Sequence, residues 1–351
     1  MSDSKQVLVT GGAGFIGSHA ARSFLDRGAK VRVYDNMSRV GSDLNLGWVK
    51  EHPAAPGRLE VVTADVRDAD AVAAATRDAD LILHAAGQTA VTKSVANPRD
   101  DFESNALGTL NVLEGARASG RQPVVIYPST NKVYGGMESA QVELADGRYR
   151  YAALEGGTPE SWPLDFHSPY GCSKGAADQY VRDYARIYDL PTIVFRQSCI
   201  YGTWQFGTED QGWLAHFIVA AVLDLPLTIY GDGRQVRDVL FIDDLTRAFH
   251  VAVERVEVTA GEVYNIGGGP DLTLSLLELI GMLEELRGQP MRYEFDDWRP
   301  GDQRVYVSDI GKARADFGWL PEISVEEGVR RLYGWAQANR DLLVAALART
   351  T

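Results

Sequence analysis

Short apolar runs recur along the first half of the chain and alternate with longer segments whose apolar residues follow a helical spacing. The runs are rich in Val, Ile and Leu, and they cover residues 7–10, 31–35, 59–65, 81–86 and 124–130. Runs of this kind are typical of strands buried on both faces of a parallel sheet. The segments 15–27 and 102–119 are predicted helices, and the second ends at Gly120. This alternation predicts an α/β fold with a Rossmann-type, doubly wound parallel sheet.

The pattern changes after Gly135. Residues 137–168 contain several Gly, Pro and aromatic residues without a helical period, which predicts an irregular insertion or a β-ribbon. A further strand is predicted over residues 192–198. The predicted helices of this half cover about 173–188, 213–223, 243–255, 275–287 and 325–339. No long linker separates these elements, so we expect the chain to return to the sheet several times and to form a discontinuous second part.

Composition and charge narrow the possible partners. The 351 residues include 35 Lys and Arg against 48 Asp and Glu, a formal net charge of -13. This balance argues against a nucleic-acid partner or a lipid-headgroup surface, because both need a basic patch. No run of about 18 apolar residues predicts a membrane span, and no signal-peptide pattern precedes the first strand. Cys172 and Cys199 have no metal-ligand spacing. We therefore expect a cytoplasmic protein without a metal.

A glycine-rich turn follows the first predicted strand and opens the first predicted helix. It reads Gly11-Gly-Ala-Gly-Phe-Ile-Gly17. Glycines at these positions permit a tight turn, a close approach of the backbone to a pyrophosphate, and close packing of the helix on the strand. The pyrophosphate would lie at the positive end of the helix dipole. We predict that Gly11, Gly14, Phe15, Ile16 and Gly17 bind a dinucleotide.

Acidic residues end the second and third predicted strands. Asp35 is placed to accept hydrogen bonds from the adenosine ribose, and its charge would repel a 2′-phosphate, which favours NAD over NADP. The nearby Arg39 leaves NADP open. Asp65 is placed to meet the adenine, although a helix N-cap is an alternative role. The other residues predicted to contact the cofactor are Asn36, Val66, Ala85 and Ala86.

Tyr170 and Lys174 are four residues apart and therefore share one face of a helix. A free tyrosine has a pKa near ~10 and is a poor base at neutral pH. A neighbouring ammonium and a positive nicotinamide ring favour the phenolate and lower that pKa. Thr130 ends the fifth predicted strand and can offer its hydroxyl to the same substrate oxygen. Thr130, Tyr170 and Lys174 are the predicted catalytic residues, and Tyr170 and Lys174 are also predicted to contact the cofactor.

With these motifs together, the chain resembles the extended short-chain dehydrogenases/reductases over nearly its whole length. Within that superfamily it is most similar to the CDP-paratose 2-epimerases, also called CDP-tyvelose epimerases. The segments that carry this narrower resemblance are 129–135, 164–179, 198–202 and 205–213. Two positions depart from common patterns: Cys199 stands where many superfamily members have Asn, and Trp204 stands where Arg is expected. These departures leave the exact nucleotide and sugar open.

The resemblance implies an NAD-dependent nucleotide-sugar epimerase. Tyr170 would take a proton from a sugar hydroxyl while a hydride passes to bound NAD. The resulting keto-sugar would turn and receive the hydride on its other face, so NAD is regenerated in each turnover and need not leave. Thr130 would share the hydrogen bond to the reacting oxygen, and Lys174 would hold the ribose and tune Tyr170. The resemblance also implies a homodimer.

The residues after Thr130 exclude one related reaction. Sugar-nucleotide 4,6-dehydratases carry an Asp-Glu acid/base pair there, and this chain has Asn131 and Lys132. Neither is a carboxylic acid, so dehydration is not expected. Asn131 and Lys132 are predicted to contact the substrate, although hydrogen bonding within the loop is an alternative.

Two arginines resemble the diphosphate-binding arginines of the superfamily. Arg237 and Arg299 carry guanidinium groups whose fork matches phosphate oxygens. A surface salt bridge is the alternative role for each. Gln205 is expected to line the sugar or base pocket. The substrate-binding prediction therefore comprises Asn131, Lys132, Gln205, Arg237 and Arg299.

The most specific hypothesis is inversion at C2 of a CDP-linked 3,6-dideoxyhexose. A UDP-hexose 4-epimerase, another NAD-dependent nucleotide-sugar enzyme and a non-catalytic NAD sensor are the alternatives, and the intact catalytic residues argue against the sensor. We expect an NAD-binding Rossmann domain from residues 1–190 with parts of 191–265. The substrate-binding part is expected from about 200–235 and 266–351.

Overall fold

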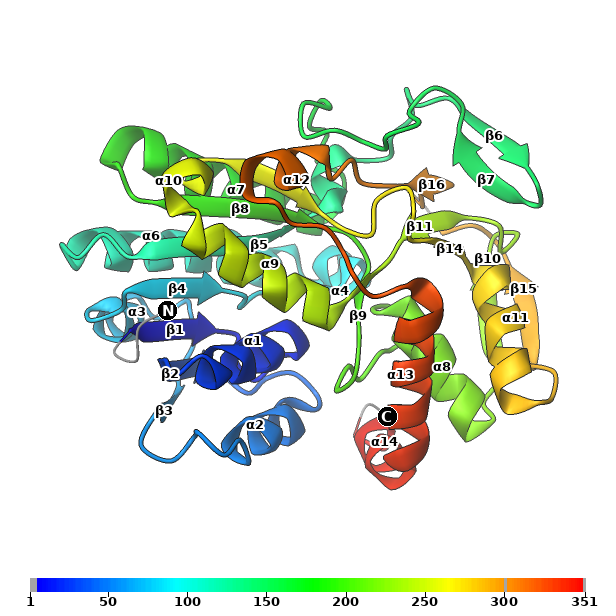
Figure 1. Ribbon diagram of the computed structural model, residues 1–351, viewed down its shortest axis with the longest axis horizontal. Helices are drawn as coiled ribbons and strands as arrows, with labels where there is room; N and C mark the ends of the chain where they lie inside the picture. The colour runs from blue at the N-terminus through cyan, green and yellow to red at the C-terminus, as the bar shows by residue number, and fades with distance from the viewer. Residues whose placement is uncertain (1–4, 300–301, 350–351) are drawn as a thin grey trace.

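A seven-stranded parallel sheet forms the centre of the molecule (Figure 1). The structure is a computed structural model that describes residues 5–299 and 302–349. In spatial order the strands are β13 (Val263–Ile266), β8 (Thr192–Gln197), β5 (Val124–Thr130), β4 (Leu81–His84), β1 (Gln6–Thr10), β2 (Lys30–Asp35) and β3 (Leu59–Thr63). The strand order reverses after β1, which is the doubly wound arrangement. The predicted Rossmann-type sheet is confirmed.

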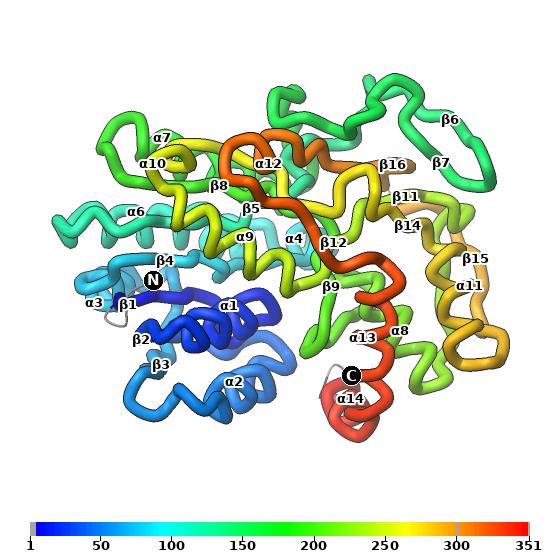
Figure 2. Tube along the Cα trace, in the orientation of Figure 1, coloured from blue at the N-terminus to red at the C-terminus, as the bar shows by residue number. Residues whose placement is uncertain are grey.

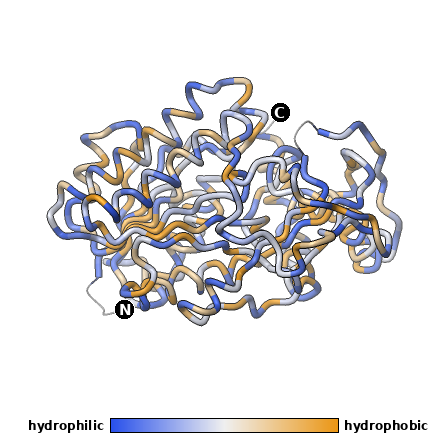
Figure 3. Tube along the Cα trace, turned by 90° about the horizontal axis from the view of Figure 1, so that it is seen from above, coloured by the Kyte–Doolittle hydropathy of each residue, from blue (hydrophilic) through white to orange (hydrophobic). Residues whose placement is uncertain are grey.

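Helices cover both faces of this sheet. On one face lie α1 (Phe15–Asp26) and α9 (Ile242–Glu254), with α2 (Ser42–Lys50) against α1. On the other lie α3 (Ala69–Thr76), α6 (Gly108–Ala118) and α7 (Ser168–Tyr188). Side chains of a strand alternate between these faces, so Val7 and Val9 join one core and Leu8 joins the other. Seen from above, the apolar strands form a band between the helical layers (Figure 3).

Two predicted helices differ from the observed ones. The helix predicted from about residue 173 begins at Ser168, because Pro169 occupies its first turn, where no backbone N–H is needed. The helix predicted over 102–119 is divided into α5 (Pro98–Phe102), a π-helical turn η1 (Glu103–Leu107) and α6. A π-turn inserts into a helix without changing the spacing of apolar residues on either side, so the periodicity did not indicate it.

The segment 137–168 contains the predicted β-ribbon as well as irregular chain. Strands β6 (Val142–Ala145) and β7 (Arg148–Tyr151) pair in an antiparallel hairpin. This hairpin lies beside the small sheet of β14 (Thr273–Ser275), β11 (Val236–Asp238) and β16 (Val305–Tyr306), as Figure 2 shows. It therefore belongs to the second part of the molecule rather than to the seven-stranded sheet.

The second part is built from several separate segments. Its helices are α8 (Trp213–Leu223), α11 (Leu276–Arg287), α12 (Gly311–Phe317), α13 (Val325–Ala338) and α14 (Arg340–Leu347). Two further strand pairs join β10 (Leu227–Tyr230) with β15 (Tyr293–Asp296) and β9 (Ile200–Tyr201) with β12 (Leu240–Phe241). The short helices not yet named are α4 (Val91–Ala96), η2 (Asn131–Tyr134) and α10 (Val256–Thr259).

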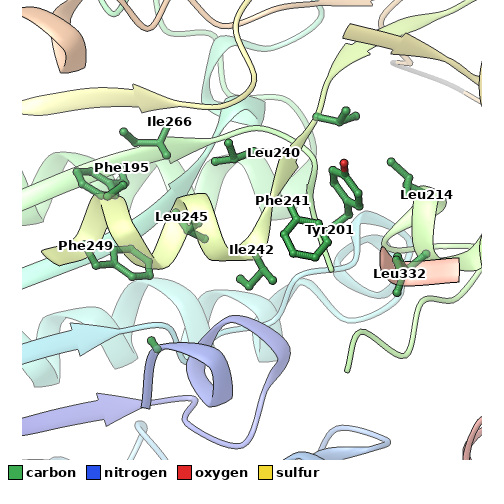
Figure 4. Close-up of a cluster of buried hydrophobic side chains, with 14 of the residues drawn as sticks. Phe195, Tyr201, Leu214, Leu240, Phe241, Ile242, Leu245, Phe249, Ile266 and Leu332 are labelled. Atoms are coloured by element: carbon green, nitrogen blue, oxygen red, sulfur yellow. The ribbon is translucent and has the colours of Figure 1, made fainter. Parts of the chain in front are cut away.

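One apolar core continues from the sheet into this second part. Phe195 of β8 and Phe249 of α9 stack at one end of it, and Tyr201, Phe241 and Leu332 of α13 lie at the other (Figure 4). Such continuity fixes the position of the second part relative to the carboxyl ends of the parallel strands. Among the described residues, no helix is long and apolar enough to cross a membrane.

Candidate active site

The glycine turn joins β1 to α1 and is tightly packed. Gly11 has a φ of +67°, and a Cβ there would lie 2.6 Å from the backbone nitrogen of Ala86. A Cβ on Gly17 would lie 2.1 Å from the carbonyl oxygen of Gly11. Larger residues therefore cannot occupy either position without moving the backbone. The two glycines bring β1, β4 and the first turn of α1 into direct contact.

The beginning of α1 can accept an anion. Gly14 is the N-cap, and within the described chain no side chain caps the helix and no acidic residue lies in its first turn. The first backbone N–H groups, at Phe15 and Ile16, thus keep free donors next to the positive end of the helix dipole. A Cβ on Gly14 would meet only the Gly11 carbonyl oxygen, at 3.1 Å, so its outer side is open. These residues fit a dinucleotide diphosphate.

The carboxylates predicted to contact adenosine differ in their partners. Asp35 accepts hydrogen bonds from the backbone nitrogens of Ala13 and Met37, at 3.0 and 2.8 Å. Burial raises the pKa of Asp35, whereas these two hydrogen bonds lower it. Asp35 is thus fixed against the glycine turn at the end of β2, where the ribose of a bound dinucleotide lies.

Asp65 is already engaged by neighbouring side chains. It accepts hydrogen bonds from the Arg67 guanidinium at 2.7 Å and from Asn36 Nδ2 at 2.8 Å. Arg67 is the main cause that lowers the pKa of Asp65 to about 2. The helix N-cap that was the alternative for Asp65 is instead Asp68, which accepts from the backbone nitrogen of Ala71. Asp65 thus holds the Asn36 side chain beside the end of β2 through a hydrogen bond.

The end of β4 borders the same place. The Ala85 and Ala86 backbone nitrogens donate to Thr10, at its carbonyl oxygen and its hydroxyl. Val66 is buried, and its carbonyl oxygen accepts from Asn111. Ala85 and Ala86 keep the carboxyl ends of β1 and β4 side by side without filling the space above them.

Thr130 and Tyr170 come together at the end of β5. Both side chains are buried. Burial raises the pKa of Tyr170 to about 12, and the nearby Thr130 hydroxyl opposes this rise. The Thr130 hydroxyl also accepts from the Lys132 backbone nitrogen and thereby caps the short helix η2. The hydroxyl groups of Thr130 and Tyr170 are thus placed where both could form a hydrogen bond to the same hydroxyl of a sugar.

Lys174 lies one helical turn beyond Tyr170 on α7. Its ammonium donates to the Pro128 carbonyl oxygen at 2.7 Å and lies 4.2 Å from the centre of the Tyr127 ring. Burial lowers the pKa of Lys174 to about 7, and Asp178 and Asp101 oppose this effect. The helix therefore presents Tyr170 and Lys174 to the same side, as predicted, while the ammonium is anchored on β5.

Sequence reasoning missed Asp101, a buried carboxylate behind this pair. Asp101 accepts from the hydroxyl of Ser173 at 2.5 Å, from Gln88 Nε2 at 2.9 Å and from Asn105 Nδ2 at 3.1 Å. Asp101 raises the pKa of both Tyr170 and Lys174. No local pattern marks it, because it lies in α5, which is distant in the sequence from Tyr170 and was not part of the helix predicted over 102–119.

Asn131 and Lys132 occupy the first turn of η2, close to Thr130. Asn131 Oδ1 accepts from the Thr130 hydroxyl at 3.4 Å, so the loop-bonding role considered for it is present. Burial and Arg237 lower the pKa of Lys132. Arg237, on β11, donates to Asp302 at 2.7 Å. Lys132 and Arg237 therefore place two positive charges beside one carboxylate at the border of the second part.

The other two predicted substrate residues are bonded to different neighbours. Gln205 Nε2 donates to the Ile200 carbonyl oxygen, and its buried Oε1 has no partner among the described residues. Arg299 pairs with Glu209 at 3.1 Å and lies 3.9 Å from the centre of the Tyr230 ring. The structure thus gives Arg299 the salt-bridge environment that was its alternative. Pro300 and Gly301, in the segment that resembles the superfamily, lie outside the described residues.

Trp204 has a packing role that its sequence position did not reveal. Its ring stacks on Trp48 of α2 at 4.9 Å and lies 5.7 Å from Trp335 of α13. Phe206 also contacts Trp335. These aromatic contacts connect a helix on the sheet with a helix of the second part. Trp204, at a position where Arg was expected, thus packs between the two parts of the molecule.

The model of the NAD dependent epimerase/dehydratase family matches residues 7–267. The chain belongs to this family. The match begins in β1, includes the glycine turn, Thr130, Tyr170 and Lys174, and ends just after β13. It thus spans the whole seven-stranded sheet, and the family is NAD dependent by description.

Individual relatives of this family match over nearly their full length. The chain is 43% identical over 340 residues to the CDP-paratose 2-epimerase of Salmonella typhi, covering 95% of this chain and 99% of that one. It is 32% identical to a putative UDP-glucose 4-epimerase of Methanocaldococcus jannaschii, with the same two coverages. The structure of a dTDP-glucose 4,6-dehydratase from Streptomyces venezuelae, solved with NAD bound, matches with a TM-score of 0.80 at 33% identity, covering 96% and 98%.

Proposed function

We propose that this protein is an NAD-dependent epimerase that inverts C2 of a CDP-linked 3,6-dideoxyhexose and interconverts CDP-paratose and CDP-tyvelose. The observation that carries the proposal is the 43% identity to a CDP-paratose 2-epimerase over 95% of this chain. The putative UDP-glucose 4-epimerase is 32% identical over the same share. The higher identity favours the CDP-linked substrate over a UDP-hexose, which is the second candidate.

In this proposal Tyr170 is the proton acceptor and donor. When bound, NAD supplies the hydride acceptor for oxidation of the sugar carbon and the hydride donor for its reduction. The Tyr170 oxygen takes the proton of the sugar hydroxyl in the first half and returns it to the keto oxygen in the second. Because burial raises the pKa of Tyr170 to about 12, its phenolate needs positive charge nearby, and Lys174 lies one turn away. Thr130 holds the reacting oxygen against Tyr170.

The neighbours of Thr130 support reversible oxidation without elimination. Loss of water from the sugar needs a group that protonates the departing hydroxyl. Asn131 has no acidic proton, and its oxygen is bonded to Thr130. Lys132 can donate a proton only in its charged form, and burial and the nearby Arg237 lower its pKa, which disfavours that form. Lys132 interacts electrostatically with Arg237 and Asp302, and we assign it, with Arg237, to the substrate diphosphate.

The sugar nucleotide is proposed to lie between the two parts of the chain. We assign residues 1–190 and parts of 191–265 to the NAD-binding domain, and about 200–235 and 266–351 to the substrate-binding part. Lys132 and Asp302 support this division, since they come from opposite sides of that boundary and their charges interact. Gln205 offers a buried amide oxygen without a partner in the described chain. Arg299 would have to leave Glu209 to reach a phosphate.

A homodimer is also proposed. Four apolar or aromatic side chains on α5 and α7 are exposed, and they are Phe102, Tyr180, Ile187 and Tyr188. The two helices contact each other, so these side chains belong to neighbouring surfaces. Apolar residues exposed on adjacent helices support an interface between two copies. Light scattering after gel filtration would give twice the mass of 38.4 kDa.

The proposed activity is tested with purified protein, CDP-paratose and no added NAD. NMR of the anomeric region should show the CDP-tyvelose signals, whereas a Tyr170→Phe variant should leave the substrate unchanged. UDP-glucose and dTDP-glucose serve as the comparison substrates under the same conditions. Turnover of UDP-glucose alone would support the 4-epimerase, and absence of any new epimer from CDP-paratose would refute the main proposal.

A further inference from the structure

Arg39 connects three segments that are far apart in the sequence. Its guanidinium donates to the Thr89 hydroxyl at 3.0 Å and to the side-chain oxygen of Gln211. Arg39 follows β2, Thr89 follows β4, and Gln211 comes just before α8 in the second part. A single side chain therefore ties two loops of the Rossmann sheet to the segment 205–213.

The sheet order determines where this side chain lies. Strand β1 lies between β2 and β4. A side chain that starts after β2 and is bonded to Thr89 after β4 lies at the same carboxyl edge of the sheet as the end of β1. The glycine turn begins there, and Asp35, four residues before Arg39, accepts a hydrogen bond from Ala13 in that turn. Arg39 therefore lies at the edge of the sheet where the glycine turn and the beginning of α1 are found.

The charge of Arg39 is not neutralised by an ion pair. Within residues 5–299 and 302–349, no carboxylate forms a salt bridge with it, although the chain carries 48 Asp and Glu. Its two hydrogen-bond acceptors, Thr89 and Gln211, are neutral. Desolvation lowers the pKa of Arg39, and the nearby Asp35 opposes this. The Arg39 side chain is exposed, and a guanidinium with only neutral acceptors gains from an anion, because hydrogen bonds between two charged groups are about twice as strong as neutral ones.

We propose that Arg39 binds the diphosphate of the dinucleotide and slows its release. A diphosphate at the glycine turn would lie at this same edge of the sheet. The guanidinium then exchanges neutral oxygens of Thr89 and Gln211 for phosphate oxygens. A 2′-phosphate is the less suitable anion, because Asp35 would repel it. Since Gln211 belongs to the segment 205–213, the same side chain links cofactor retention to the substrate side. The inference rests on NAD being the cofactor of the proposed function, and it does not depend on the sugar.

The test measures dissociation of NADH from the full-length protein. Wild type, Arg39→Ala, Arg39→Lys and Arg99→Ala are loaded with NADH, excess NAD is added, and the loss of bound-NADH fluorescence gives the rate. Arg99 is a matched control, because its side chain is 88% exposed and, among the described residues, pairs with Glu103 of the next turn alone. We expect Arg39→Ala to release NADH about 10- to 100-fold faster, since charge-assisted hydrogen bonds are lost. Arg39→Lys should be intermediate, and Arg99→Ala should match wild type.

A second variant keeps Arg39 and changes its neighbour. Gln211→Glu places a carboxylate beside the guanidinium, which competes with the diphosphate and should speed NADH release several-fold. Unchanged release from an Arg39→Ala protein with wild-type melting temperature would overturn the inference. The inference would also be overturned if Arg39→Ala released NADPH faster but NADH at the wild-type rate, because Arg39 would then bind a 2′-phosphate. A protein that shows the Arg39 effect but leaves CDP-paratose unchanged would refute the proposed substrate and leave this inference standing.

Discussion

The Lys174 ammonium donates a hydrogen bond to the carbonyl oxygen of Pro128 at 2.7 Å. This bond anchors a positive charge at the end of β5, one turn from Tyr170. Asp178, one of the two carboxylates acting on Lys174, is paired with Arg196. Lys174 is thus a buried cation whose charge is only partly balanced, which is useful for holding a phenolate and unfavourable for folding.

Replacing Lys174 with Met should therefore stabilise the cofactor-free protein in a pH-dependent way. The folded pKa of Lys174 is about 7, below its usual value of 10.5. Between these values the unfolded chain binds a proton that the folded chain lacks, so stability of the wild type rises with pH. The gain in stability of Lys174→Met over wild type should be largest at or below about pH 7 and should disappear toward about pH 10. Melting temperatures at the two pH values check this, and a difference independent of pH would contradict it.

Asp101→Asn should move the pH profile of kcat to lower pH. Asp101 raises the pKa of Tyr170 and of Lys174. Removing its negative charge lowers both values, so both limbs of the profile should shift by less than about one pH unit. Ser173→Ala, which removes a partner of Asp101 but no charge, is the control and should leave the limbs in place. A shift to higher pH would show that Asp101 acts differently.

Arg237 and Asp302 allow stability and substrate affinity to be separated. Arg237→Ala leaves the partly buried Asp302 carboxylate without its partner and should cost about 1–3 kcal/mol of stability. It should also raise KM for the nucleotide sugar at least about 10-fold, since a charge-assisted contact to phosphate is lost. The Arg237→Ala, Asp302→Ala double variant should recover stability without recovering KM. Recovery of both stability and KM would mean that Arg237 affects KM only by stabilising the fold.

Trp204→Ala should affect stability far more than substrate choice. The variant removes the stacking on Trp48 and the contact with Trp335, which should cost about 2–4 kcal/mol. Urea unfolding measures this loss, with Trp298→Ala, at a partly exposed position, as the control. KM for the substrate should stay within about threefold of wild type. A large change in KM with unchanged stability would indicate that Trp204 contacts the substrate and would contradict the packing role.

The hydrophobic pattern predicted the sheet well because strands buried on both faces produce continuous apolar runs. The helix of Tyr170 was predicted five residues too short, since Ser168 and Pro169 look like loop residues unless Pro is recognised as the first residue of a helix. The π-turn over residues 103–107 was missed, because it leaves the apolar spacing on both sides unchanged. Periodicity predicts elements and not their local irregularities.

The site was predicted where a motif has fixed spacing. Gly11 follows β1 directly, and Tyr170 and Lys174 lie one turn apart on α7, as these spacings predicted. Arg39 and Asp101 act through contacts with residues fifty or more positions away, such as Thr89 and Ser173, which no local pattern encodes. Their roles become visible only once the strand order is known.

The central claim is that C2 is inverted by oxidation and hydride return on a bound cofactor. The most direct measurement is NMR of CDP-paratose incubated with the purified protein in deuterated water without added NAD. A hydrogen that moves as a hydride does not exchange with solvent, whereas a proton taken from carbon does. We predict CDP-tyvelose that carries ordinary hydrogen at C2. Deuterium at C2, or no new epimer, would contradict this account.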